Sequence, residues 1–428
     1  MTNFVTSTEM LPNVFWVGAI DWTIRIFHGY HTDEGSSYNA YLIKDTIPTL
    51  IDCVKEPFWE EFLERVSAVI PLDQIKQIIV NHAEGDHTSA LPLVMPKFPN
   101  ATIITNKVCK EHLCILYPSL KSCSWQLVDN SKTISTGSRT LGFLLVPNLH
   151  WPDSMFTLDA TNNILFSNDG FGQHIASTDR WADQVQDIEH LMYLLKEYTA
   201  NILGPFRAPI RTALKAAATL KIEYILTAHG CSWRGDFLGY PLREYSLYAH
   251  RLNLKQKLLI VFDSVYGATE NAAKTLSEGA YSCGVRSQIC DLRVVDLTKV
   301  AYHAYDAGGI AFGSPTINSR LSVKTEAALR YLRGLQLIGN KPGCVFGAFG
   351  WAQKSLNMME TYLESANCNV IGKVEFKYLL GDKSRESLFA LGCEIAEAIK
   401  SKILIQEEKQ EDENGEISES SVMQHESE

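Results

Sequence analysis

The stretch Gln77-Ile-Ile-Val-Asn-His82-Ala-Glu84-Gly-Asp86-His87 decides the fold of this 428-residue chain. An apolar run typical of a strand ends in a turn that carries four potential metal ligands within six residues. A carboxylate at position 84, in place of a third imidazole, makes such a site harder and more anionic, which suits iron or manganese better than zinc. Taken alone, the same motif is also compatible with a polar turn that holds only capping residues.

Three further potential ligands make a two-metal site the better interpretation. His150, Asp169 and His229 each come within three residues of the end of an apolar run. Each lies beside small or turn-forming residues, which let the backbone approach closely. Three carboxylates in the whole set, together with a bridging hydroxide, would neutralise two divalent ions.

The order H-x-E-x-D-H, followed by H, D and H, resembles the β-lactamase-like domain of flavodiiron proteins, and the resemblance covers about residues 5–405. Zinc hydrolases of the same fold typically carry H-x-H-x-D-H. The resemblance implies that His82, Glu84 and His150 bind one iron, that Asp86 and His229 bind the other, and that Asp169 bridges them. In the family, the histidine at the position of His87 is usually held away from the metals, and we expect the same here.

Two other side chains are expected near the metals. The resemblance places His28 and Tyr198 there as candidate hydrogen-bond or proton donors for catalysis. Both could equally be polar groups whose hydrogen bonds are satisfied within a half-buried wall.

A second domain begins near residue 258, where apolar runs alternate with helical segments and predict a doubly wound parallel sheet. Its first strand leads into a hydroxyl-rich loop and a helix, whose N–H groups and hydroxyls would cradle a phosphate. Two later loops would meet the first outside the carboxyl ends of the strands. Three loops at flavodoxin-like positions make FMN the expected cofactor, and the first loop matches neither a dinucleotide nor an ATP motif. The residues expected to bind it are Ser264, Val265, Tyr266, Gly267, Ala268, Thr269, Ser314, Pro315, Thr316, Ile317, Asn318, Ala348, Phe349, Gly350 and Trp351. Many flavodiiron proteins carry Ser and Tyr at the positions of Ala348 and Phe349.

The expected fold class is α/β with two domains and a tail. Residues 1–252 are predicted to form a metallo-β-lactamase-like αββα sandwich, and residues 256–405 a flavodoxin-like doubly wound parallel sheet. A final helix is expected over about 384–404. The acidic, Ser-rich segment 406–428 is predicted to be a disordered tail.

The composition argues against some classes of binding partner. A net charge of −10 and a pI near 5.7 argue against general attraction to nucleic acid or to anionic membranes. Ten cysteines are scattered without a C-x-x-C pair, so no rubredoxin-like iron site is encoded. Because the chain also shows no secretory leader and no apolar span, a cytoplasmic location is expected.

The leading hypothesis is a flavodiiron reductase. FMN would pass electrons from an external donor to a non-haem di-iron site that reduces O2 to water, and possibly NO to N2O. No donor domain follows residue 405, so the donor is expected to be a separate protein or reduced cofactor. The family's head-to-tail arrangement implies a homodimer or a dimer of dimers. The alternatives are a binuclear zinc hydrolase fused to a flavodoxin-like domain, which Glu84 disfavours, and a non-catalytic electron carrier, which the intact ligand set disfavours.

Overall fold

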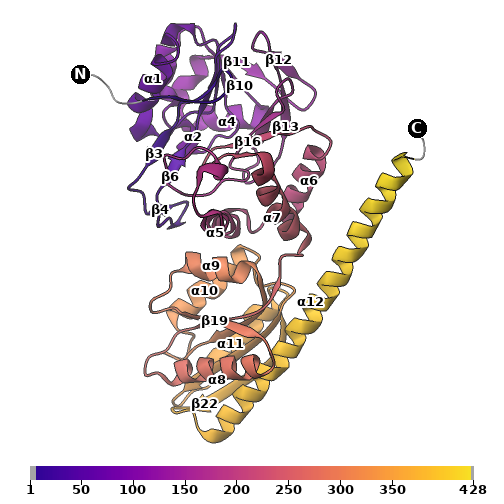
Figure 1. Cartoon of the computed structure of the whole chain (residues 1–428). Helices are drawn as coiled ribbons and strands as arrows, with labels where there is room; N and C mark the ends of the chain where they lie inside the picture. The colour runs from indigo at the N-terminus through magenta and orange to yellow at the C-terminus, as the bar shows by residue number, and fades with distance from the viewer. Residues whose placement is uncertain (1–5, 426–428) are drawn as a thin grey trace. The chain divides into compact units, whose positions relative to one another are not determined.

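The computed structural model describes residues 6–425, with side chains through residue 408. The chain divides into two compact units, one of Met1–Tyr198 with Phe206–Ala249 and one of Thr199–Pro205 with His250–Glu428. The short π-helix η6 (Thr199–Leu203) therefore belongs to the second unit, although it directly follows α5 (Ile188–Tyr198), a helix of the first unit that Figure 1 labels.

The first unit is built on two mixed sheets. The seven-stranded sheet has the order β1 (Thr8–Leu11), β2 (Val14–Trp16), β7 (Tyr41–Ile43), β8 (Thr49–Ile51), β9 (Gln77–Ile79), β10 (Thr102–Thr105), β11 (Ser124–Leu127). The six-stranded sheet has the order β12 (Thr133–Ser135), β13 (Thr140–Leu145), β14 (Met155–Asp159), β15 (Ile164–Asn168), β16 (Tyr224–Thr227), β17 (Trp233–Arg234). Two short hairpin-like pairs are added, β3 (Ala19–Asp21) with β6 (Ser36–Tyr38) and β4 (Ile26–Phe27) with β5 (Tyr30–His31).

The strand β9 shows how the layers of this unit arise. Successive side chains of a strand point to opposite faces of its sheet. Ile79 therefore enters the core between the two sheets, where it meets Phe166 of the second sheet. Ile78 enters the core on the other face, against buried residues of α1 (Trp59–Ser67), α3 (Leu91–Val94) and α4 (Lys107–Leu116). The helices α5 (Ile188–Tyr198), α6 (Arg207–Ala217) and α7 (Gly239–His250) complete the predicted αββα sandwich.

The second unit has the predicted parallel, doubly wound sheet. Its order is β19 (Arg286–Asp291), β18 (Lys255–Phe262), β20 (Ala307–Gly313), β21 (Pro342–Phe349), β22 (Asn369–Lys377). The helices are α8 (Ala268–Ser282), α9 (Leu297–Tyr305), α10 (Val323–Gly334), α11 (Ser355–Glu364) and α12 (Asp382–His425). Leu276 of α8 and Ile395 of α12 share one apolar core with the sheet. No helix in the described part of the chain is long and apolar enough to cross a membrane.

Two elements of the second unit differ from expectation. The edge strand β22 was not predicted, because Lys373 and Glu375 interrupt its apolar run. Helix α12 continues to His425, well past the end expected near residue 404 and through most of the segment expected to be a disordered tail. Residues 405–414 are rich in Glu, Gln and Lys and contain no Pro, so local propensity favours helix there. Residues 426–428 lie outside the described residues.

Candidate metal centre and flavin cavity

The six predicted metal ligands meet at one edge of the first unit. Strands β13 and β15 run in the same direction, because both pair antiparallel with β14, and β15 pairs parallel with β16. The three strands therefore end at the same edge of the sheet, which brings His150, Asp169 and His229 together. The loop after β9 contributes His82 and Glu84 to the same place.

The ligand atoms fall into groups in which all atoms lie within 4.8 Å of one another. The first group is His82, Glu84, His150 and Asp169; the second is Asp86, His87, Asp169 and His229; a third joins His28 to Glu84 and Asp86. Asp169 belongs to the first two groups. Its Oδ2 lies 3.4 Å from His150 Nε2 and its Oδ1 lies 3.2 Å from His229 Nε2. A carboxylate that offers one oxygen to each group is placed to bridge two metal ions.

The position of His87 differs from expectation. Its side chain is fully buried, and its Nε2 lies 3.0 Å from Asp169 Oδ1 and 3.3 Å from Asp86 Oδ2. Both Asp86 and His87 lie in the one-turn helix α2 (Gly85–Thr88), which begins directly after Glu84. This tight turn directs both side chains toward the cluster of predicted metal ligands. The structure therefore places His87 inside the cluster, not away from it.

Hydrogen bonds orient two of the histidines. His229 Nδ1 donates to the Ser37 carbonyl at 2.7 Å, and His82 Nδ1 donates to Asp153 Oδ2 at 3.1 Å. In both rings Nε2 is then the nitrogen that faces the cluster and is available to a metal. Such outer partners fix the tautomer and the ring orientation of metal-binding histidines.

Asp153 contacts a predicted metal ligand and was missed by the sequence reasoning. Its buried carboxylate accepts from His82 Nδ1 and from the Ala83 N–H, the latter at 2.7 Å, and its Oδ1 lies 3.2 Å from His112 Nδ1. It follows His150 by three residues, but the sequence shows only a turn there.

The electrostatics of the cluster suit cations. Burial alone would raise the pKa of the Glu84 carboxyl, but the neighbouring His150 and His82 rings lower it to about 2. Burial would also raise the pKa of Asp169, and the neighbouring His87 with its other histidine partners holds it well below its usual range. The carboxylates are therefore ionised in a buried site.

Several polar atoms of the cluster are buried and yet lack a hydrogen-bond partner, namely both oxygens of Asp86, Asp169 Oδ2, His150 Nε2 and His229 Nε2. His229 Nε2 lies 3.1 Å from Asp86 Oδ2 without making a hydrogen bond to it. Because unpaired buried polar groups are costly, their convergence indicates a ligand that they all contact. Imidazole and carboxylate donors in this mixture fit two iron ions.

Two glycines allow the ligand loops to turn this tightly. A Cβ on Gly170, next to Asp169, would lie 2.9 Å from the Phe156 ring. Gly230, next to His229, has a φ of +69°, and a Cβ there would lie 1.8 Å from Gln173 Oε1. Larger residues would displace the neighbouring ligands.

The structure places both predicted catalytic side chains beside the cluster. His28 Nε2 lies 3.3 Å from Glu84 Oε1, and burial lowers the pKa of His28, so its imidazole is neutral. Tyr198 is fully buried, and its hydroxyl has no hydrogen-bond partner. Burial raises the pKa of Tyr198 well above its usual value, with a further contribution from the charge of Asp169, so the hydroxyl keeps its proton.

A third side chain in this wall, His174, was not predicted. Its ring centroid lies 5.0 Å from that of Tyr198 and 4.9 Å from that of His229. Its Nδ1 is 2.8 Å from Ser36 Oγ, whereas its Nε2 has no hydrogen-bond partner. The run Gly170-Phe-Gly-Gln-His174 directly after Asp169 could have pointed to it.

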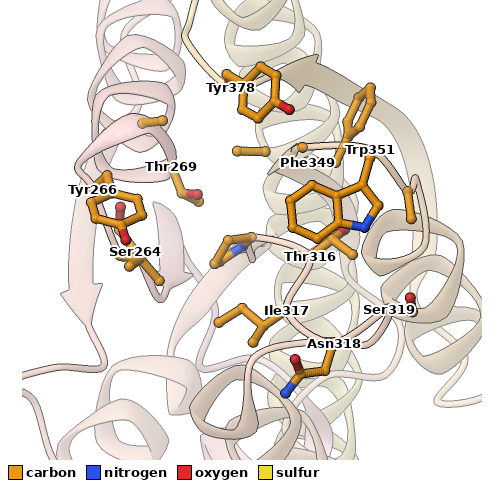
Figure 2. A pocket seen from close by; sticks show the side chains of 16 residues that line it. Ser264, Tyr266, Thr269, Thr316, Ile317, Asn318, Ser319, Phe349, Trp351 and Tyr378 are labelled. Atoms are coloured by element: carbon orange, nitrogen blue, oxygen red, sulfur yellow. The ribbon is translucent and has the colours of Figure 1, made fainter.

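The second unit contains a cavity of about 420 Å³ at the carboxyl ends of its strands (Figure 2). Thirteen of the fifteen residues predicted to bind FMN line it. The other two shape the loops: Gly267 caps α8 with a φ of +82°, and the buried Ser314 Oγ accepts from the Ser322 N–H at 3.0 Å. Ser319, Ala352 and Tyr378 also line the cavity and were missed. Tyr378 follows the unpredicted strand β22, and its N–H donates to the Phe349 carbonyl at 2.8 Å.

The lining of the cavity fits FMN. The buried Ser264 Oγ has no hydrogen-bond partner and lies next to the N-terminus of α8, where a phosphate would be accepted. Tyr266 and Trp351 lie on opposite sides of the cavity (Figure 2), and their side chains are 96% and 90% exposed. They offer aromatic surface to a flat ring system.

Comparison with known proteins finds relatives for both units. The family described as ODP family beta lactamase matches residues 37–230, and the flavodoxin family matches residues 260–394. The nitric oxide reductase of Moorella thermoacetica is 36% identical over 364 residues, or 84% of this chain and 90% of that protein. The rubredoxin-oxygen oxidoreductase of Megalodesulfovibrio gigas is 32% identical and covers 93% of this chain and 99% of its own length. The crystal structure of the flavodiiron protein from Giardia intestinalis superposes with a TM-score of 0.93 at 46% identity, covering 95% of this chain and all of that one.

Fold, cluster and cavity together define an oxidoreductase with FMN in a flavodoxin domain and a di-iron centre in a β-lactamase-like domain. The chain belongs to the flavodiiron protein family. The zinc hydrolase alternative is not supported, since the relatives named by activity are oxidoreductases.

Proposed function

We propose that this protein is a terminal reductase that takes electrons from a separate donor and reduces O2 to water, and NO to N2O. The observation that carries the proposal is the convergence of an imidazole and carboxylate cluster, with Asp169 shared by two groups, in a chain that also has a flavin cavity. The donor is proposed to be a separate protein or reduced cofactor; one relative is named for rubredoxin.

The ligand assignment is part of the proposal. One iron would be held by His82, Glu84 and His150, the other by Asp86, His87 and His229, and Asp169 would bridge them. This assignment adds His87 to the set expected from the sequence, because its Nε2 faces the same centre as that of His229. The predicted FMN residues are proposed to bind FMN in the cavity that most of them line.

The side chains around the cluster would position the substrate and supply protons. When bound, FMN relays electrons and the di-iron centre is the place where the small substrate is reduced. Reduction of O2 to two waters takes four protons with four electrons. Tyr198 holds a proton at its unpartnered hydroxyl, and neutral His28 can donate or accept at nitrogens that make no hydrogen bond. We propose both as catalytic residues.

Metal analysis of the wild-type protein tests the first step of the proposal. Protein expressed with ample iron and purified without oxygen should contain near two irons per chain, and should consume O2 or NO when given a reductant. Near two zincs per chain, without redox activity, would overturn the proposal. Comparing O2 and NO consumption then assigns the preferred substrate.

Ligand variants test the same site directly. Glu84→Ala and His229→Ala should abolish reductase activity and lower the iron content, while FMN stays bound because its loops lie in the other unit. Glu111→Ala on α4 is a matched control, since that side chain is 60% exposed and outside the cluster. Full activity in either ligand variant would contradict the di-iron assignment.

We further propose a head-to-tail homodimer or a dimer of dimers, in which electrons pass from the FMN of one chain to the irons of the other. The exposed aromatic side chains beside the flavin cavity support a covered surface there. A cytoplasmic location, argued from ten scattered cysteines, stays a prediction.

A subunit-mixing experiment distinguishes electron transfer between chains from electron transfer within one chain. Glu84→Ala removes an iron ligand, and Ala348→Trp fills the flavin cavity, so each variant alone should be inactive. After subunit exchange, half of the dimers are mixed and each has one working pair, so about a quarter of wild-type activity should return. No recovery, with mixed dimers demonstrated by mass, would contradict transfer between chains.

A further inference from the structure

The second unit carries a pair of cysteines that reductase chemistry does not use. Cys283 caps the end of α8, and Cys393 lies in α12. The Cys393 thiol lies close enough to Cys283 to raise its pKa. Both sulfurs also lie against the hydroxyl of Ser282, with Oγ at 3.9 Å from Cys283 Sγ and 3.4 Å from Cys393 Sγ. Both side chains are partly exposed, so small reagents can reach them.

Backbone contact between the two helices holds this pair in place. A Cβ on Gly279 would lie 2.1 Å from the Phe389 carbonyl oxygen, and a Cβ on Gly392 would lie 2.3 Å from the Leu276 carbonyl oxygen. The helices therefore touch where both residues are glycine. Cys393 Sγ donates to the Gly279 carbonyl at 3.3 Å. The close helix packing thus holds both sulfurs beside the same Ser282 hydroxyl.

The other eight cysteines differ from this pair in burial or in the unit to which they belong. Six are buried, namely Cys53, Cys109, Cys231, Cys290, Cys344 and Cys368. Burial raises the pKa of Cys53 and of Cys231 to about 12, which keeps these thiols protonated and unreactive. Cys114 and Cys123, in the first unit, are partly exposed and serve as internal controls.

Polar and charged groups surround the two thiols. The neighbouring Cys393 thiol is the largest influence on Cys283 and raises its pKa. Lys400 lies close enough to both sulfurs that their charge raises its own pKa, and its Nζ pairs with Glu397 at 2.8 Å. An ammonium group beside the pair attracts the negative charge of a thiolate, which is the form that reacts with a peroxide.

We propose that Cys283 and Cys393 are a modification site at which a peroxide forms a reversible disulfide between α8 and α12. One of the two thiols, as its thiolate, attacks one oxygen of hydrogen peroxide, so that an S–O bond forms, the O–O bond breaks and hydroxide leaves. The other thiol, on losing its proton, attacks that sulfur; the S–S bond forms and the S–O bond breaks. The departing hydroxides take up the two thiol protons, so two thiols and one peroxide give one disulfide and two waters. The sulfurs lose two electrons and the peroxide gains two.

The disulfide should stabilise the second unit without touching the flavin cavity. It would close a loop of 110 residues, from 283 to 393. Constraining an unfolded chain over that length should raise the Tm of this unit by roughly 5–10 °C. The FMN loop lies at the opposite end of α8, whose 15 residues span about 22 Å. FMN content should therefore stay constant.

Peptide mapping of the FMN-loaded, full-length protein tests the proposal. After brief exposure to a slight excess of hydrogen peroxide, free thiols are alkylated and the digest is analysed by mass spectrometry. The expected product is a peptide pair joined through Cys283 and Cys393, which dithiothreitol releases. The pair should be missing in Cys283→Ser and Cys393→Ser, which should also lose the rise in Tm. Cys114→Ser should behave as wild type.

Other outcomes overturn the proposal. Separate sulfinic acids at the two positions without a linked peptide would show that the thiols do not join. A linked peptide found only between chains, or a rise in Tm that survives in Cys393→Ser, would exclude the intramolecular disulfide as its cause.

Discussion

His82 shows how much of this site depends on single contacts. Its Nε2 lies 3.3 Å from Glu84 Oε2, while its Nδ1 donates to the buried Asp153 and its ring packs edge-on against Trp151 at 5.0 Å. Asp153 also accepts the Ala83 N–H. One carboxylate therefore sets both the ring of a metal ligand and the backbone of the ligand loop, although it does not face the cluster itself.

Asp153→Ala should weaken iron binding about 10–100-fold, because it leaves His82 free to rotate and removes the partner of the Ala83 N–H. The measurement is a titration in metal buffers, read by iron content per chain. Asp153→Asn keeps an acceptor oxygen and should recover part of the affinity, whereas FMN content should not change in either variant. Equal iron affinity in Asp153→Ala and wild type would show that Asp153 does not position His82.

The packing of helix α12 against the second unit includes one close crossing with α8. Its first turns pack into the core of the second unit, and Ile403 is the last of its described side chains that is buried. At the crossing, Gly392 leaves no space for a Cβ. The sequence pattern predicts a helix here, but not which glycine the packing requires.

Gly392→Ala should lower the free energy of unfolding of the second unit by about 1–3 kcal/mol, because the added methyl group must displace the α8 backbone. Gly334→Ala is the matched control, since Gly334 ends α10 and a Cβ there meets nothing within 4 Å. The control should be neutral or slightly stabilising. Chemical unfolding followed by flavin fluorescence measures both, and equal effects would contradict the close crossing.

The whole molecule keeps its two cofactor sites in different units. Every predicted iron ligand belongs to the first unit, and every residue that lines the flavin cavity belongs to the second. In the first unit the ligand carboxylates are buried together, so bound cations relieve their mutual repulsion.

Removal of iron with a chelator should therefore lower the Tm of the first unit and leave FMN bound. A ligand at a thousandfold excess over its Kd stabilises a folded unit by about 4 kcal/mol, so the loss should be easily measured. Calorimetry with parallel readings of iron and flavin content checks this. Release of FMN in step with iron would show that the two sites are coupled.

The metal and flavin sites differ in how far the sequence could predict them. His82, Glu84 and Asp86 lie within five residues, and their spacing together with the ligands at three strand ends predicts the metal site. His174, Asp153 and Tyr378 carry no such spacing. Each reaches its site only through contacts with another strand or loop, such as Ser36 for His174 and Phe349 for Tyr378.

The sequence by itself determined the two-domain α/β architecture, the expected ligand set and the three flavin loops, because these follow from local periodicity and from motifs within short segments. Only the tertiary structure decided that His87 faces the cluster, that Asp153 orients His82, that β22 closes the sheet edge, and that Cys283 meets Cys393. The physical reason is that these are contacts between segments distant in the chain, set by how sheets and helices pack rather than by any local preference.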